Sequence, residues 1–237
     1  MMSGTGFQGQ GTVITPTATV TVNYTNTNGI GFYQSSGGTD YWQNGYSGRN
    51  DAISPYTSSL VDNSPTGSDI IALNHAGSQT LSFSQEIANP VFAFVSLNSN
   101  GYSFLNQDFE ILSVGGVDGN ACGYWGCGGI NKVVVDLGNG NTEYRLNSSG
   151  VSGSEPHGVI RFTGAFSTLN WNSQTNEFWN GFTVGVQGTA AEVFIPEPTT
   201  ISLMILGILG LTAMSSRYSS RVFAQGNGVV AAIGNPD

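Results

Sequence analysis

The sequence predicts an all-β protein: an antiparallel β-sandwich or jelly-roll-like domain over residues 12–194, followed by one C-terminal transmembrane helix. Three observations predict this class. The chain has 34 glycines and only 9% charged residues, and its apolar residues lean towards Phe, Tyr, Val and Ile, which suit pleated strands joined by tight turns. Nine or ten short strand patterns alternate with turn residues, without a convincing amphipathic helix between them. One uncharged stretch near the C-terminus approaches the length of a membrane helix.

The N-terminal part of the chain predicts little regular structure before residue 12. Residues 1–11 are mostly Gly, Ser, Thr and Gln without Lys or Arg, so they lack the basic and apolar segments of a signal peptide. We expect a flexible N-terminus. From Thr12 to Tyr24, β-branched and polar residues alternate, which predicts one half-exposed strand of the edge type. The polar stretch 29–68 predicts long loops that carry short strands.

Regular strand patterns resume after residue 68. The segment 90–97 is apolar on both faces, as expected for a strand in the middle of a packed sheet. The Asn139-Gly140 pair favours a tight reversal, so the runs 132–137 and 142–146 should pair antiparallel. We expect the apolar core to come from 91–97, 133–137, 159–166 and 182–186. The other predicted strands cover 70–73, 79–84, 109–114, 159–163, 166–171 and 181–186.

A sharp break follows the domain at Ile195-Pro196-Glu197-Pro198, because two prolines cannot extend a central strand. The 19 residues between Glu197 and Arg217 carry no charge, close to the roughly 20 residues that a helix needs to cross a bilayer. The basic residues Arg217 and Arg221 would remain on the cytoplasmic side. We therefore expect a membrane-spanning segment over 199–216.

This order of features resembles the PEP-CTERM sorting signal of bacterial surface proteins, which an exosortase-type membrane enzyme processes. Pro196, Glu197 and Pro198 match the motif, and Arg217 and Arg221 match the basic end. The resemblance covers 195–221, and the segment 158–185 is more loosely similar to the β-domain of such proteins. It implies export to the cell envelope, transient anchoring in the membrane and cleavage near the motif.

Two features depart from this family's usual pattern. Export requires a signal peptide, and we interpret that signal as missing from this sequence. Residues 222–237 continue well beyond the arginines, where such signals normally end, and we expect an atypical disordered tail there.

The charge balance excludes one class of partner. The net charge is −9, and all of it arises before Pro196, where four basic residues face thirteen acidic ones. A surface this acidic repels phosphate backbones, which are bound by clustered Lys and Arg. We expect no nucleic acid partner. Lys132 is the only lysine, and low charge combined with much Asn, Ser, Thr and Gly is typical of secreted proteins.

The two cysteines, Cys122 and Cys127, enclose the sequence Gly-Tyr-Trp-Gly. In an exported loop such a pair most often forms a local disulfide, which we favour over free thiols. Metal binding through these sulfurs needs further Cys or His close in the sequence, and none is present. We expect no cofactor.

The sequence does not predict an enzyme. Its histidines, His75 and His157, are not accompanied by a Gly-x-Ser-x-Gly or His-Glu-x-x-His motif, so a hydrolase is a remote alternative. Carboxylates at Asp108, Glu110 and Asp118 are oxygen ligands of the type that calcium prefers. The spacing of a calcium loop is absent, and solvated turn residues are the favoured interpretation.

Five aromatic residues lie in polar loops: Tyr41, Trp42, Tyr46, Tyr124 and Trp125. Exposed rings stack on sugars in lectin-like domains, although such rings also fold back to cap a core. We therefore expect a surface or extracellular-matrix protein with a structural or adhesive domain. The alternative is a carbohydrate-binding module, with calcium assistance and extracellular polysaccharide as a partner. A binder should gather its aromatic residues in one patch, whereas a structural protein should scatter them.

Overall fold

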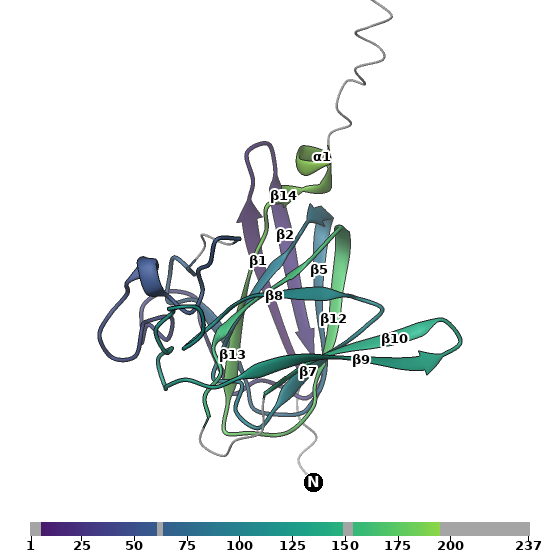
Figure 1. The fold of residues 1–237 in the computed structure, drawn as a ribbon. Coiled ribbons are helices and arrows are strands. Elements are labelled where there is room, and N and C mark those ends of the chain that lie inside the picture. Colours follow the sequence, from purple (N-terminus) through teal and green to yellow (C-terminus); the bar gives the residue numbers. More distant parts are fainter. Residues whose placement is uncertain (1–5, 61–63, 149–153, 195–237) are drawn as a thin grey trace, which may run out of the picture. The chain divides into compact units, whose positions relative to one another are not determined.

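The protein is all-β, with antiparallel strands arranged in two sheets, as a computed structural model of the chain describes it (Figure 1). The structure describes residues 6–60, 64–148 and 154–194. The first sheet has the order β1-β2-β5-β12-β7-β10-β9, with β14 on β5, and the second has the order β3-β4-β13-β6-β11-β8. The predicted all-β, antiparallel class is confirmed.

The strands of the first sheet are β1 (Phe7–Ile14), β2 (Thr19–Asn26), β5 (Gly77–Ala88), β7 (Gly101–Leu105), β9 (Ile130–Gly138), β10 (Asn141–Ser148), β12 (Ala165–Ser173) and β14 (Gly188–Thr189). Those of the second are β3 (Phe32–Gln34), β4 (Ile70–Leu73), β6 (Val91–Val95), β8 (Phe109–Val114), β11 (Gly158–Phe162) and β13 (Asn180–Gly185). Two short helices complete the described chain, the 3-10 turn η1 (Asp51–Ile53) and α1 (Ala190–Val193).

Strand β6 explains why the molecule has two cores. It lies between β13 and β11 in the middle of the second sheet, and its two faces are buried in different cores. Phe92 and Phe94 belong to the main core between the sheets, together with Trp171 from the first sheet. Ala93 and Val95 belong to a second core on the other face of β6. The apolar pattern of 90–97 therefore predicts its central position correctly.

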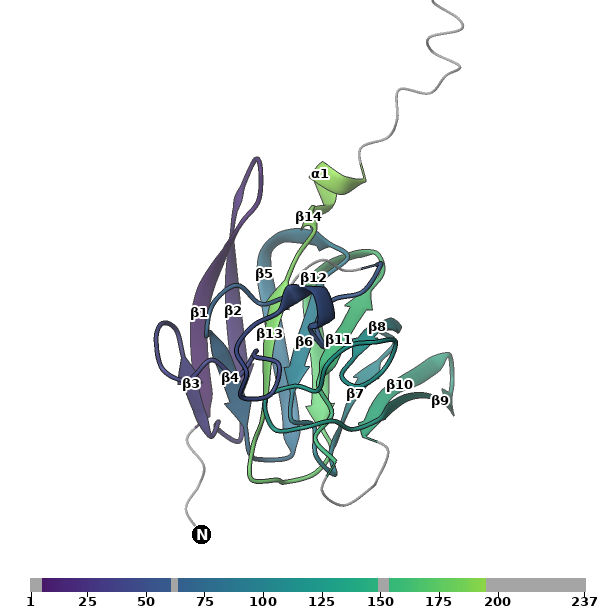
Figure 2. The same ribbon diagram turned by 60° about the vertical axis from the view of Figure 1, so that its left-hand side comes forward.

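The second core is covered by the long connection 35–69 instead of a further sheet. Figure 2 shows this connection, with η1, in front of the second sheet. Trp42 and Tyr56 from the connection pack there with Ile70 and Val159 of the sheet, and the Trp42 and Tyr56 ring centroids are 5.1 Å apart. Burial of these large rings fixes the connection to the sheet.

The predicted N-terminal boundary is wrong. Strand β1 begins at Phe7, and the predicted strand 12–24 is two strands, because Thr15 N–H donates to the Ala18 carbonyl in a turn between β1 and β2. Strand β2 also pairs with β5, so β1 is the strand at one edge of the first sheet, and β9 is at the other. Gly9 and Gly11 hide the alternation of β1 because they leave its inward positions without side chains.

The hairpin of β9 and β10 is confirmed, with Asn139 and Gly140 both at positive φ in the reversal. Its predicted contribution to the core is wrong. Strand β9 is the outermost strand of the first sheet, and Val134 and Leu137 are 59% and 52% exposed. The hairpin extends beyond the second sheet (Figure 1), so alternation alone did not reveal which residues have a facing layer.

The end of the domain is attached to its beginning by the Glu192 carboxylate. This side chain accepts hydrogen bonds from Thr17 N–H at 2.6 Å and from the Thr15 hydroxyl at 2.9 Å, both in the β1–β2 turn. It also accepts from Thr189 N–H at 2.6 Å, completing a capping box at the start of α1. The hydrogen bonds from Thr17 and Thr189 lower the pKa of Glu192 to about 2.

The chain divides into two units between Phe194 and Ile195. The predicted sorting signal over 195–221 and the predicted tail over 222–237 lie outside the described residues. Within the described ranges, the helices are too short to cross a bilayer.

Candidate functional site: an aromatic cluster on the disulfide loop

Cys122 and Cys127 lie at disulfide distance and are bonded, as the sequence predicts, with Cα atoms 4.6 Å apart. Inside the loop, Gly126 N–H donates to the Gly123 carbonyl at 3.1 Å, and Gly126 has a φ of 141°, which L side chains rarely adopt. The four enclosed residues therefore form a tight turn. Its two aromatic residues, Tyr124 and Trp125, are held beside each other with ring centroids 4.8 Å apart.

The disulfide loop rests on the buried ring of His157. A Cβ atom on Gly123 would lie 2.1 Å from this ring, so only glycine permits the contact. Glu155 N–H donates to the Cys127 carbonyl at 3.0 Å, and Gly115 N–H donates to the His157 carbonyl at 2.9 Å. These contacts attach the loop to the ends of β8 and β11.

His157 has the properties of a packing residue. Its ring is fully buried, and Nδ1 lies 2.6 Å from the Glu155 carbonyl oxygen. Burial lowers the pKa of His157 to about 4, so the ring is neutral at pH 7. His75, the other histidine, is exposed in the connection between β4 and β5.

Four of the five predicted aromatic residues meet in one cluster. Tyr41 and Tyr46, from the connection between β3 and β4, surround the disulfide loop: Tyr41 lies 5.1 Å from Tyr124, and Tyr46 lies 4.9 Å from Tyr124 between ring centroids. Trp179, just before β13, lies 4.9 Å from Tyr41 and joins this group. We call these residues the aromatic cluster: Tyr41, Tyr46, Tyr124, Trp125 and Trp179.

The fifth predicted residue, Trp42, does not belong to the aromatic cluster. It is only 1% exposed, and its indole Nε1 donates to the Asp69 carbonyl at 3.2 Å in the second core. Neighbouring residues 41 and 42 thus point in different directions. Asp40 fixes this arrangement, because its carboxylate accepts from Trp42 N–H at 3.1 Å and pairs with Arg49 at 2.6 Å.

The sequence does not reveal Trp179 as a member of the aromatic cluster, because nothing in its local sequence distinguishes it from the residues leading into β13. Its neighbour Phe178 is 93% exposed, whereas Trp179 is half-buried against Phe32 and Tyr41. Three separate connections meet at the cluster. Sequence spacing alone therefore cannot reveal it.

The aromatic cluster presents two exposed rings to solvent. Tyr46 is 72% exposed and Trp125 is 44% exposed, with ring centroids 6.2 Å apart and planes at 87°. Tyr41 and Tyr124 pack against these two rings. Gly45 N–H donates to the Gly123 carbonyl at 3.2 Å, which joins the loop of Tyr46 to the disulfide loop. Two perpendicular aromatic walls with a rigid support offer a stacking surface for an apolar ring face.

Two of the three carboxylates considered as calcium ligands form ion pairs with basic side chains. Asp108 pairs with Lys132, and Glu110 pairs with Arg161 at 2.8 Å. Asp118 lies in a turn at positive φ. In the described part of the chain, no three His, Cys, Asp or Glu side chains are arranged to hold a metal ion.

Comparison of the chain with protein-family models, with curated protein sequences and with solved structures finds no match.

Proposed function

We propose that this chain is an exported bacterial surface protein whose β-domain binds carbohydrate through the aromatic cluster. In this proposal the signal over 195–221 directs the protein to an exosortase-type membrane enzyme, and the segment 199–216 anchors it transiently. The Pro196-Glu197-Pro198 motif and the basic residues Arg217 and Arg221 support the sorting step. The bonded Cys122–Cys127 pair supports an oxidising compartment outside the cytoplasm.

The convergence of aromatic residues from three connections is the observation that carries the binding proposal. A domain without a binding partner at this surface has no need to expose two large rings side by side, because such rings cost free energy in water. Trp125 supplies a flat face on which the C–H face of a sugar ring packs. Tyr46 supplies a perpendicular wall and a hydroxyl that can hydrogen-bond to sugar hydroxyl groups.

The second candidate is a matrix protein that assembles without a carbohydrate ligand. The same exposed rings favour it if they pack against another protein chain in the matrix. The two candidates differ in what removal of a ring does: the first loses retention by polysaccharide, and the second does not. Catalysis is no part of either proposal, since the buried His157 is used for packing.

Affinity electrophoresis in gels containing different neutral and acidic polysaccharides tests the binding proposal. We expect at least one polysaccharide to retard the protein, and we expect Trp125→Ala and Tyr46→Ala to restore free mobility. Leu137→Ala is the matched control, because Leu137 is similarly exposed on the distant β9–β10 hairpin. Free mobility in all gels would favour the matrix candidate.

Cell fractionation in a host that contains an exosortase-type enzyme tests the sorting proposal separately. Replacement of Arg217 and Arg221 by Glu should impair membrane retention before processing, because basic residues fix the orientation of the membrane segment. Unchanged fractionation of this variant would contradict the sorting proposal and leave the carbohydrate proposal standing.

A further inference from the structure

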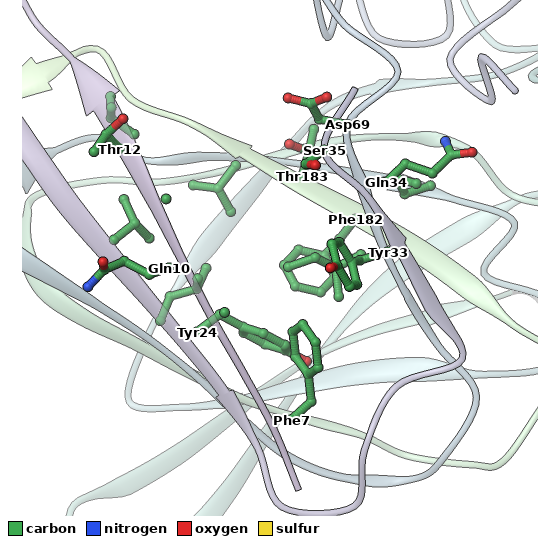
Figure 3. A pocket seen from close by; sticks show the side chains of 18 of the residues that line it. Phe7, Gln10, Thr12, Tyr24, Tyr33, Gln34, Ser35, Asp69, Phe182 and Thr183 are labelled. Carbon is green, nitrogen blue, oxygen red and sulfur yellow. The ribbon is translucent and has the colours of Figure 1, made fainter. Parts of the chain in front are cut away.

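An apolar cleft of about 480 Å³ opens between the two sheets at the β1 edge of the first sheet. The β9–β10 hairpin lies at the other edge of that sheet. One wall comes from β1 and β2, and the other from β3, β4 and β13 (Figure 3). The volume lies within the range of small-molecule sites, about 300–1,000 Å³. The aromatic cluster contributes none of the residues that line it.

Gly11 opens the cleft, and Gly9 lies beside it under the ring of Phe7, which a Cβ atom on Gly9 would approach to 3.1 Å. Gly9 and Gly11 occupy inward positions of β1, between Phe7 and Val13, and lie opposite Tyr24 and Val22 of β2. A Cβ atom on Gly11 would meet no atom within 4 Å, so this position faces open space. Side chains of ordinary size at these positions would extend the main core to the sheet edge. The edge strand instead leaves an apolar cavity beside it.

Two aromatic rings narrow one end of the cleft. Phe7 and Tyr33 approach each other across the sheets with ring centroids 5.6 Å apart. Six residue steps from Phe7 to Val13 at about 3.4 Å each give a wall of about 20 Å. The floor is apolar, with Val22, Leu81, Ile71, Phe182 and Val184 among its residues. These dimensions suit a linear alkyl chain better than a broad ring system.

The opposite end of the cleft is polar and carries one charge. Asp69 and Ser35 lie together there, away from Phe7 (Figure 3). Asp69 is the only charged side chain among the lining residues, all of which belong to the described part of the chain. Its carboxylate takes part in none of the ion pairs formed among described residues. An unpaired carboxylate beside an apolar channel complements a cation attached to an alkyl chain.

We propose that the cleft binds a linear amphiphile with an alkyl chain of about dodecyl length and a protonated amine at one end. The alkyl chain lies along Gly9 and Gly11 between the sheets and is removed from water there. The ammonium group lies at Asp69 and donates hydrogen bonds to its carboxylate and to the hydroxyl of Ser35. This proposal is independent of carbohydrate binding by the aromatic cluster.

Photolabelling of the full chain with a dodecylamine that carries a diazirine in its alkyl chain tests the proposal. Mass spectrometry of the labelled peptides should place the label on residues 7–13 and 182–184. Gly11→Leu should reduce this labelling at least tenfold, because its side chain fills the channel. Asn23→Leu, on the outward face of β2, is the control and should leave labelling unchanged.

Competition separates the contribution of charge from that of the alkyl chain. Dodecylamine should displace the label at concentrations about tenfold lower than dodecanoate, and Asp69→Asn should abolish this difference. Label that is confined to other residues, such as 201–214, or that persists in a folded Gly11→Leu variant would overturn the site. Equal competition by amine and carboxylate would overturn the role of Asp69. If Gly11→Leu fails to fold by circular dichroism, the smaller Gly11→Val replaces it.

Discussion

The disulfide loop and the β1 edge of the cleft both depend on glycine, but for opposite reasons. At Gly123 the absence of a side chain allows the His157 ring to come so close that a Cβ would lie 2.1 Å from it. At Gly11 the absence of a side chain leaves space that no neighbouring atom fills within 4 Å. One glycine produces tight packing and the other an opening. A glycine in the sequence therefore does not by itself say whether the backbone there is tightly packed or borders an open space. Only the neighbouring atoms in the structure decide this.

The largest expected effect on stability is at Gly123, where the packing is tight. Gly123→Val should lower the free energy of unfolding by about 3 kcal/mol, because the added side chain must displace either His157 or the disulfide loop. Chemical denaturation followed by tryptophan fluorescence measures the change. A loss below about 1 kcal/mol would mean that the loop can move away from His157 without cost, and the comparison would fail.

Removal of the disulfide should have a somewhat smaller effect on stability. The double variant Cys122→Ser/Cys127→Ser should lose about 2 kcal/mol, the value that the chain-entropy model gives for so short a loop. The same variant should bind polysaccharide more weakly, because Tyr124 and Trp125 are no longer held in place. Denaturation and affinity electrophoresis of the same sample measure both. Unchanged carbohydrate binding would show that the other rings position Trp125 by themselves.

Acid should weaken the packing at His157. The pKa of its ring is about 4 in the folded protein and about 6.5 when unfolded, so the unfolded state binds more protons between these values. Its stabilising contribution is complete above pH 6.5 and is lost as the pH falls. Between pH 7 and pH 5 the loss should be about 2 kcal/mol.

The carboxyl group of Glu177 gives stability the opposite pH dependence. Its effect must therefore be separated from that of His157. Burial raises the pKa of the Glu177 carboxyl to about 8, although the amides of Asn180 and Asn100 partly oppose the shift. The folded state therefore binds the extra proton between about pH 4.5 and pH 8, and acid stabilises it there. The Glu177→Gln variant isolates the effect of His157, and Glu177→Gln/His157→Gln is its control. Equal pH slopes for these two variants would contradict the prediction.

The smallest effect on stability should be at Gly11, where the space beside the backbone is open. Gly11→Ala adds a methyl group in free space at a φ that permits any residue, and it removes conformational freedom from the unfolded chain. We expect a gain of less than about 1 kcal/mol, measured by the same denaturation assay as Gly123→Val. A clear destabilisation would mean that the cleft is narrower than described.

The sequence predicts a turn or strand correctly where local residue preferences and the pattern of apolar residues favour the same structure. The reversal at Asn139-Gly140 and the apolar strand 90–97 are of this kind. It fails at β1, because Gly9 and Gly11 carry no pattern, and at β9, because alternation does not say whether a facing sheet exists. For the site, the sequence predicts the disulfide and the aromatic composition. It cannot predict that Tyr41 points outwards while Trp42 is buried, since the cluster depends on contacts among three distant connections.

The attachment of Glu192 to the β1–β2 turn has a mechanical consequence for a domain held at its C-terminal end. Tension on the chain beyond Phe194 enters through α1 and reaches Thr15 and Thr17 by way of the Glu192 carboxylate. The β1–β2 hairpin and β14 then share the load, so a pull from beyond Phe194 does not act on the two residues of β14 alone. Because the pKa of Glu192 is about 2, this clamp keeps its charge in acidic surroundings. The hairpin it loads is also a wall of the cleft, so a pull on the chain beyond Phe194 would strain the cleft directly.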